Sequence, residues 1–168
     1  MLKASISKLK IQPHTTGHKT RICKTCLINK HIDDYEVAKG YKRRECRTCR
    51  SAEKRKKISN NPHLYINNLY GQLAYRRKKT HKFNITREYL HKLYDKQKGI
   101  CEYSGVVMTN VKDGSGYHLQ NISIDRIDNT KGYEEGNIAL VCLAVNMMKY
   151  TLELEELIDW CKNISKNN

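Results

Sequence analysis

Long hydrophobic runs are absent from this sequence of 168 residues. No stretch approaches the roughly 18 apolar residues that a membrane-spanning helix needs, and residues 1–14 lack the continuous apolar region of a secretory signal. With 39% hydrophobic residues and a mean hydropathy of −0.75, the chain is expected to form one ordinary domain or two small ones with modest cores. The sequence therefore predicts a soluble, intracellular protein without a membrane partner.

Acidic residues are scarce in the first hundred positions, where 7 aspartates and glutamates accompany 26 lysines and arginines. Residues 101–168 hold 10 acidic and 6 basic residues, so the formal charge of +15 is concentrated toward the N-terminus. A basic segment of this kind attracts a phosphate backbone regardless of base sequence. A solvated charged face is one alternative, but that interpretation suits scattered charges, and here they are clustered (42–57 and 76–82). An anionic membrane surface is another, although neither cluster lies beside a long apolar face. Nucleic-acid contacts are expected at Lys42, Arg43, Arg44, Arg47, Arg50, Arg76, Arg77, Lys78 and Lys79.

Four of the seven cysteines form two Cys-x-x-Cys pairs separated by 19 residues, namely Cys23, Cys26, Cys46 and Cys49. Without an export signal, reduced thiols that bind metal are expected rather than disulfides. Two such pairs supply the four sulfurs of a tetrahedral Zn²⁺ site, and four cysteines close the coordination sphere, so the zinc is expected to be structural. A redox role for either pair is the alternative; the doubled pattern and the lack of a βαβ context disfavour it.

Three helices are predicted after the first basic cluster. Asn61 is a suitable N-cap, with Pro62 in the first helical position and apolar residues following at spacings of three and four. A second helix is expected to start after Thr86, to end at Gly99 and to pack against the segment that follows. A last helix is predicted from about Leu152.

The last predicted helix has its own expected cap and anchor. Thr151 is expected to cap it, Trp160 to anchor it to the rest of the domain, and Cys161 to be a small buried hydrophobic residue on its apolar face.

The stretch 121–150 predicts two strands followed by a short helix. An alternating pattern ends at Asp125, a glycine-containing loop of about eight to ten residues follows, and the apolar run 138–141 indicates a buried strand. A helical repeat then runs from Leu143 to Tyr150, and it carries Asn146. This order brings Asp125 close to Asn146, and carboxylate and amide oxygens suit a hard cation such as Mg²⁺.

This stretch resembles the HNH, or ββα-metal, nuclease motif of phage and large-virus endonucleases. The family places correspond here to Asp125-Arg126, Gly132, Asn137, Asn146 and Lys149. The resemblance implies that Asp125 and Asn146 hold a catalytic Mg²⁺ or Mn²⁺, that Asn137 ties the loop in place, and that the substrate is DNA. The cysteine segment is also similar to small zinc modules found ahead of some phage HNH nucleases.

Arg126 stands where the family has a histidine that acts as general base. An arginine, with a pKa above about 12, does not accept a proton at neutral pH. Two interpretations follow. In a working variant, Arg126 binds the scissile phosphate, and Asp128 or His118 helps to activate water. In an inactive one, only nucleic-acid binding survives.

A second family feature is incomplete. Many HNH nucleases carry another zinc site, whose first half would lie at Cys101 to Ser104 and whose second half at Cys142 to Val145. Only two of these four positions are cysteines, and two thiols do not make a stable tetrahedral site. We expect apolar packing to replace this zinc.

Together these observations predict an α+β protein in three parts. Residues 1–58 form a basic region with a zinc ribbon or knuckle built on the four cysteines, residues 59–83 a basic linker helix, and residues 84–168 an HNH-like ββα-metal nuclease domain. The predicted function is metal-dependent hydrolysis of DNA phosphodiester bonds by an endonuclease of homing or recombination type. The alternative is a catalytically inactive, zinc-containing DNA- or RNA-binding protein.

Overall fold

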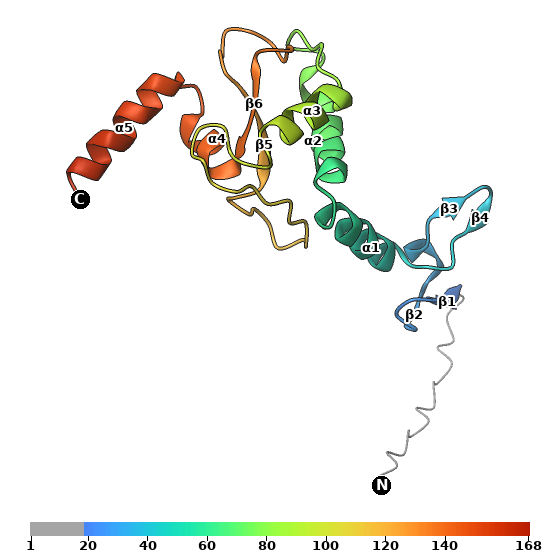
Figure 1. The fold of residues 1–168 in the computed structure, drawn as a ribbon. Coiled ribbons are helices and arrows are strands. Elements are labelled where there is room, and N and C mark those ends of the chain that lie inside the picture. The colour runs from blue at the N-terminus through green and yellow to red at the C-terminus, as the bar shows by residue number, and fades with distance from the viewer. Residues whose placement is uncertain (1–18) are drawn as a thin grey trace. The chain divides into compact units, whose positions relative to one another are not determined.

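The computed structural model describes residues 19–168 (Figure 1). The chain divides into two compact units, with the division between Ser51 and Ala52, and each unit is considered by itself. The first eighteen residues of the predicted basic region lie outside the described part of the chain. The three-part division at 58 and 83 remains a prediction.

The first unit is small and is built around a buried tyrosine. Tyr35 is fully buried between Cys23 and Cys46, and its hydroxyl donates a hydrogen bond to the carbonyl of Arg21 at 2.7 Å. Two short antiparallel hairpins surround it. The elements are β1 (Thr20–Ile22), β2 (Asn29–His31), η1 (Ile32–Asp34), β3 (Val37–Ala38), β4 (Tyr41–Lys42) and the first turn of α1 (Arg47–Ser59).

The second unit is organised around an antiparallel hairpin followed by a short helix. Its register pairs Ile124 with Leu140 and Asp125 with Ala139. Helix α4 contacts both strands of the hairpin, α2 contacts β5, and α3 contacts β6. The elements are α2 (Pro62–Arg77), α3 (Arg87–Lys96), β5 (Ile122–Arg126), β6 (Ile138–Cys142) and α4 (Leu143–Lys149). The predicted mixture of helix and strand, and the order strand, strand, helix, are confirmed.

The predicted N-cap residues mark the start of helices α2 and α3. The side chain of Asn61 accepts from the Leu64 amide at 3.1 Å, and Thr86 accepts from the Tyr89 amide at 3.0 Å. Beyond α3, the Gln97 side chain donates to the carbonyl of Leu140 at 2.7 Å and accepts from its amide at 3.1 Å. This two-way bond fastens the end of α3 to β6, so the expected packing against the motif is confirmed.

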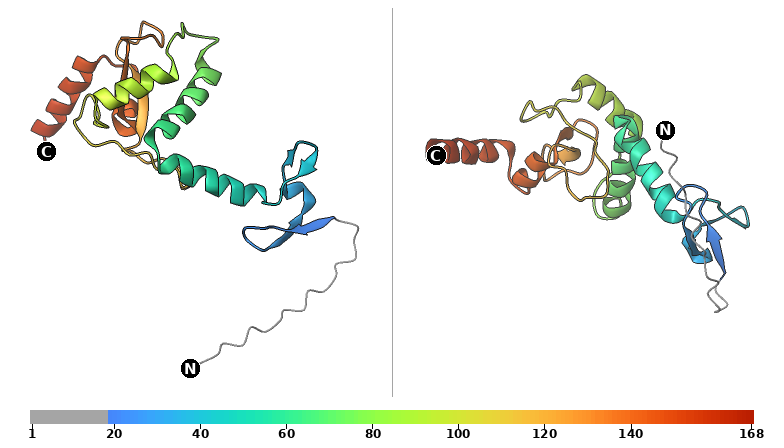
Figure 2. Two further views of the ribbon diagram at one scale, coloured as in Figure 1. Left: turned by 45° about the vertical axis from the view of Figure 1, so that its right-hand side comes forward. Right: turned by 90° about the horizontal axis from the view of Figure 1, so that it is seen from below.

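The C-terminal helix α5 (Leu154–Lys166) differs from its prediction. Glu153, rather than Thr151, caps it, in a reciprocal capping box with Glu156. Trp160 is 62% exposed and Cys161 is exposed, so their predicted burial is wrong. The helix contacts α4 near its own start and extends away from the rest of the second unit (Figure 2), so only Leu157 among its residues is buried.

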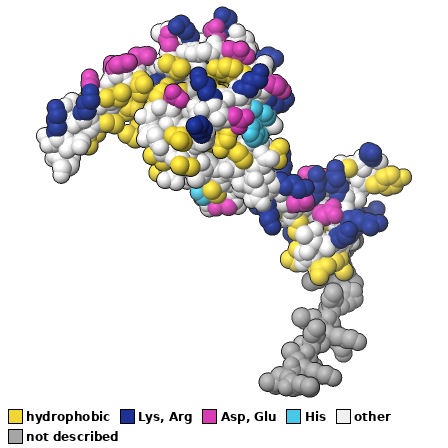
Figure 3. Space-filling model, in the orientation of Figure 1, with side chains coloured by type: hydrophobic (Ala, Val, Ile, Leu, Met, Phe, Trp, Pro, Cys, Tyr) yellow, Lys and Arg dark blue, Asp and Glu magenta, His cyan; other side chains and the backbone are white. Residues whose placement is uncertain are grey.

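The described helices include none that is long and apolar enough to cross a membrane. Most apolar side chains of α5 lie on the surface among acidic and basic ones (Figure 3).

A backbone contact joins the loop between β5 and β6 to the segment after α2. The Tyr133 amide donates to the carbonyl of Lys82 at 2.8 Å, and the Asn84 amide donates to the carbonyl of Tyr133 at 3.0 Å. Gly132 makes this approach possible, because a Cβ atom at that position would lie 2.2 Å from the carbonyl oxygen of Lys82.

We predict that Gly132→Ala lowers the free energy of unfolding by about 2 kcal/mol or more, since backbone rather than a flexible side chain must move. Urea unfolding followed by circular dichroism measures this. Gly71→Ala is the matched control: it lies in α2 with no atom within 4 Å of the added Cβ and is expected to stabilise by about 0.5–1 kcal/mol. Equal stability of Gly132→Ala and the parent would contradict the prediction.

Candidate active site and candidate metal centre

A cleft of about 570 Å³ opens in the second unit where the C-terminal end of α2 faces β5 and α4. It contains most of the residues that the sequence singled out for catalysis. Its polar lining includes Arg76, Arg77, Ser123, Asp125, Arg126, Asn129, Tyr133, Asn146 and Tyr150.

Asp125 lies near the end of β5 and is 5% exposed. One carboxylate oxygen, Oδ2, accepts a hydrogen bond from the Tyr103 hydroxyl at 3.1 Å and lies 3.3 Å from the Lys149 ammonium nitrogen. The other oxygen, Oδ1, has no hydrogen-bond partner in residues 19–168. Asp125 is therefore held through one oxygen, and the second is free of hydrogen bonds within the described chain and could serve as a metal ligand.

Asn146 comes from α4 and is oriented by β5. Its Nδ2 donates to the Ser123 hydroxyl at 2.7 Å and to the Ile124 carbonyl at 3.3 Å. Because a carbonyl only accepts hydrogen bonds, the amide nitrogen must face the strand, and Oδ1 is left as the available atom. Within the described chain Oδ1 makes no hydrogen bond. One oxygen is anionic and the other neutral, and both are of the kind that a hard divalent cation takes as ligands.

Lys149 is the residue of this site that the sequence did not explain. It is fully buried, and its Nζ donates to the Arg126 carbonyl at 2.9 Å while facing Asp125. The lysine is thus the counter-ion of a buried carboxylate. The available signal was its spacing of three from Asn146, which places both side chains on the same face of α4.

Arg126 holds the loop between β5 and β6 by hydrogen bonds to its backbone. Its Nη1 donates to the carbonyls of Asn129 and Lys131 at 2.9 and 2.8 Å, and the guanidinium lies 5.4 Å from the ring centroid of Tyr133. Its other two guanidinium nitrogens make no hydrogen bond with any described residue. The side chain is fixed in the cleft wall, with donors still available to a phosphate.

Asn137 closes the same loop, as the resemblance implied. Its Nδ2 donates to the carbonyls of Asp128 and Gly132 at 3.1 and 2.9 Å, and its Oδ1 accepts from the Asp128 amide at 2.9 Å. Asn137 is buried. It therefore acts on the cleft through the loop and not by direct contact.

Neither residue expected to help activate water lines the cleft. Asp128 accepts from the amide and hydroxyl of Thr130 and pairs with Lys131 at 2.9 Å. The Thr130 hydroxyl, the Lys131 ammonium and the Thr130 amide together hold the pKa of Asp128 well below its usual range, so it is a poor proton acceptor. His118 is engaged with Asp113 at 3.1 Å in another loop.

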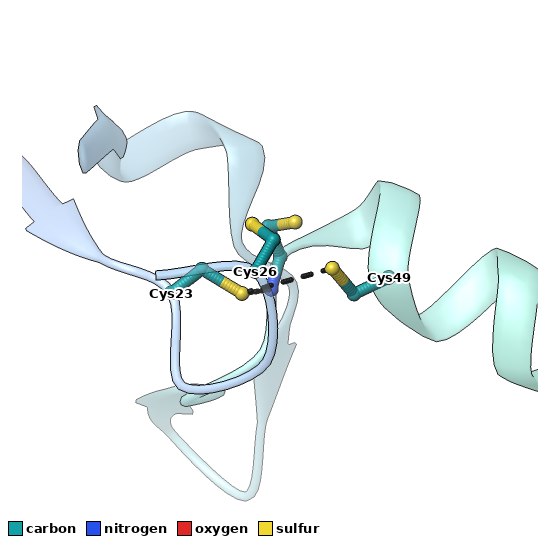
Figure 4. Close-up of side chains that lie close together, drawn as sticks. Cys23, Cys26 and Cys49 are labelled. Carbon is teal, nitrogen blue, oxygen red and sulfur yellow. Dashed lines mark hydrogen bonds between the residues drawn. The ribbon is translucent and has the colours of Figure 1, made fainter. Parts of the chain in front are cut away.

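The four cysteines of the first unit converge, with all four sulfurs within 4.8 Å of one another. Figure 4 shows Cys23, Cys26 and Cys49 pointing toward one another, and the Cys23 and Cys49 sulfurs are 3.9 Å apart. Four sulfurs bound at about 2.3 Å to a tetrahedral ion lie about 3.8 Å from one another. The cluster is therefore suited to hold a metal ion.

The environment of the cluster favours thiolates at some positions and opposes them at others. Hydrogen bonds from the backbone N–H groups of Cys26 and Cys46 lower the pKa of Cys23 to about 6. The hydrogen-bonded Cys46 thiol, together with burial, raises the pKa of Cys49 to about 12. Adjacent thiols resist ionising together, and a dication bound between them would offset that repulsion.

The two cysteines of the incomplete second site, Cys101 and Cys142, lie in the hydrophobic core of the second unit. The Cys142 amide donates to the Cys101 sulfur at 3.2 Å. Both thiols are buried among apolar neighbours.

The residues expected to contact DNA are differently placed. At the end of α2, Arg76 and Arg77 line the cleft, and Lys78 and Lys79 follow as exposed residues. In the first unit Arg43, Arg44 and Arg47 are exposed. The remaining two are less exposed and have protein partners. Lys42 donates to the Tyr35 carbonyl at 3.0 Å, and Arg50 pairs with Glu36, as Arg43 also does at 4.0 Å.

Comparison with known proteins gives two similarities, and no family model matches the chain. The chain is 31% identical over 104 residues to an uncharacterized 29.0 kDa protein in the dda-modA intergenic region of Enterobacteria phage T4. That match covers 61% of this chain but 39% of the relative, so the chain spans well under half of its length. Among solved structures, the chain is similar to the rare-cutting HNH restriction endonuclease PacI, with 21% identity and a TM-score of 0.44 over 86% of this chain and 93% of that one.

We predict that the purified protein holds one zinc ion per chain, measured by elemental analysis, and that Cys46→Ser loses it. Removing one of four thiolates opens the site, and the small core of the first unit cannot compensate. Cys161→Ser is the matched control, because that cysteine is exposed on α5, and it is expected to retain the metal. Full zinc content in Cys46→Ser would refute the assignment.

A second prediction concerns the buried ion pair. Lys149→Met leaves Asp125 buried without its counter-ion and should cost about 3–5 kcal/mol of unfolding free energy in urea titrations. Lys162→Met removes an exposed lysine paired with Asp159 and should change stability by less than about 0.5 kcal/mol. If both variants unfold with the parent, the pair contributes nothing to the fold.

Proposed function

We propose that this protein is a metal-dependent DNA endonuclease of the HNH, ββα-metal type that hydrolyses phosphodiester bonds. The observation that carries the proposal is the composition of a single cleft. Oxygen donors from Asp125 and Asn146 face the same space as the cationic side chains of Arg76, Arg77 and Arg126. A phosphodiester needs both kinds of group: cation ligands for charge stabilisation and guanidinium groups for binding.

Each residue has a role that follows from its contacts. Asp125 Oδ1 and Asn146 Oδ1 would hold Mg²⁺ or Mn²⁺, which when bound supplies a Lewis acid at the scissile phosphate. Lys149 keeps Asp125 in position, and Asn137 and Arg126 hold the loop that forms the cleft wall. The remaining donors of Arg126 would bind the phosphate and stabilise the charge that develops on its oxygens.

DNA binding is assigned to the basic residues around this cleft and in the first unit. Arg76, Arg77, Lys78 and Lys79 at the end of α2 would contact the backbone beside the scissile bond. The first unit would contribute Arg43, Arg44 and Arg47, with Zn²⁺ at its four cysteines as a structural ion. Such contacts are independent of base sequence and weaken as salt is added.

A second candidate is a DNA- or RNA-binding protein that has lost catalysis. The contact that favours it is the one between Lys149 and Asp125, because an internal ammonium satisfies this carboxylate without any metal. Arg126 in place of the usual histidine points the same way. In this case the cleft would bind a phosphate and leave it intact.

Plasmid nicking separates the two candidates. The proposed enzyme converts supercoiled DNA to the nicked form with Mg²⁺ or Mn²⁺ and does not do so in EDTA. Asp125→Asn keeps the size of the side chain but removes the anionic ligand, and is expected to lower the rate at least about 100-fold.

Asp159→Asn is the matched control, since Asp159 is an exposed carboxylate on α5, and its rate is expected to equal that of the parent. Thermal melting of both variants checks that they are folded. Salt-dependent DNA binding without nicking under either metal would favour the inactive alternative over the enzyme.

A further inference from the structure

No histidine is among the described residues that line the cleft, but one contacts a side chain that does. His81 follows α2 and packs edge-on against Tyr133, with ring centroids 5.8 Å apart. Tyr133 lines the cleft, and the same ring carries the guanidinium of Arg126. His81 and Arg126 are thus neighbours across one aromatic side chain, although 45 residues separate them in the sequence.

The Thr80 hydroxyl has a single hydrogen and two acceptors within reach, the Arg77 carbonyl at 3.3 Å and Nδ1 of His81 at 2.9 Å. When the hydrogen goes to the carbonyl, the threonine oxygen accepts from Nδ1–H of the imidazole. In this arrangement Nδ1 carries the proton of the neutral ring, and Nε2 has a free lone pair. Nε2 makes no hydrogen bond to any described residue.

The surroundings of the ring favour its neutral form. Burial, together with the positive charges of Arg126 and Arg77, lowers the pKa of His81 below its ordinary value. The contacts and charges on the ring come from Thr80, Tyr133 and these two arginines. No carboxylate among the described residues pairs with it, so the ring is mainly neutral at neutral pH.

We propose that His81 is the general base of the hydrolysis, an inference that rests on the proposed nuclease function. Nε2 takes one proton from a water molecule while the water oxygen forms a bond to phosphorus. The bond from phosphorus to the 3′ oxygen breaks, and that oxygen is protonated by solvent to give a 3′-hydroxyl and a 5′-phosphate. His81 then releases its proton to solvent, so one water is consumed for each bond cut.

This assignment accounts for Arg126. A permanent cation cannot accept a proton, but it can bind the phosphate and keep a nearby imidazole neutral. The base is then supplied by the segment that follows α2, while β5 keeps the ligand Asp125 and a phosphate-binding arginine. The proposed base and the phosphate-binding arginine thus lie on different elements, and both contact Tyr133.

Single-turnover nicking of a plasmid in Mg²⁺ tests the proposal with His81→Ala, His81→Gln and the control His118→Ala. A general base contributes roughly 10²–10⁴-fold, so both His81 variants are expected to lose at least about 100-fold. The His118 variant is expected to stay within about twofold of the parent. DNA affinity without a divalent cation, measured by fluorescence anisotropy, is expected to change by less than about threefold in all of them.

Two readouts report on the base itself. The rate of the parent is expected to rise with pH through the lowered pKa of His81 and then to level off. This pH dependence should disappear in His81→Ala. Added imidazole should partly restore the rate of that variant. Independently of activity, ¹⁵N chemical shifts of the His81 ring should show a protonated Nδ1 and an unprotonated Nε2 at neutral pH.

The outcomes separate this inference from the function on which it rests. A parent that nicks DNA and a His81→Ala variant that nicks it equally fast overturn the inference alone. A rate that falls as pH rises through this range also overturns it, because His81 would then act as a cation on the phosphate. A parent that fails to nick in Mg²⁺ and in Mn²⁺ overturns the proposed function, and the base with it.

Discussion

The buried ion pair between Asp125 and Lys149 constrains the rest of the second unit. The two residues are 5% and 0% exposed, so neither charge can return to water without unfolding its surroundings. Lys149 lies on α4 and also binds the carbonyl of Arg126, which locks this helix onto the end of β5. Asn146, on the same helix, is then held with its amide against the strand and its oxygen free.

The cleft is assembled from rigid parts and a loop that other side chains hold closed. Asn137 and Arg126 bind backbone carbonyls of the loop between β5 and β6, and Gly132 permits its contact with the segment after α2. That contact brings Tyr133 and His81 together. The geometry of the site thus depends on hydrogen bonds from these two side chains to backbone carbonyls of the loop.

Much of the fold was predictable because its signals are local. Asn61 and Thr86 cap their helices by bonds to amides three residues away, and an alternating pattern ending at Asp125 marks a half-buried strand. The prediction failed at Trp160 and Cys161, where an apolar face on α5 indicated burial. Periodicity reports that a helix is amphipathic, but it does not say whether the chain supplies a partner for the apolar face.

The sequence by itself determined α2, α3, the order of β5, β6 and α4, the two cysteine pairs, the uneven charge and the placing of Asp125 and Asn146 on a strand and a helix. Each of these follows from side-chain chemistry acting over a few residues. Only the tertiary structure decided that Lys149 neutralises Asp125, that Arg126 closes a loop and that His81 packs against Tyr133. These contacts join residues up to 52 positions apart. A buried charge or polar group needs a partner, and a distant segment can supply that partner only when the whole unit has folded.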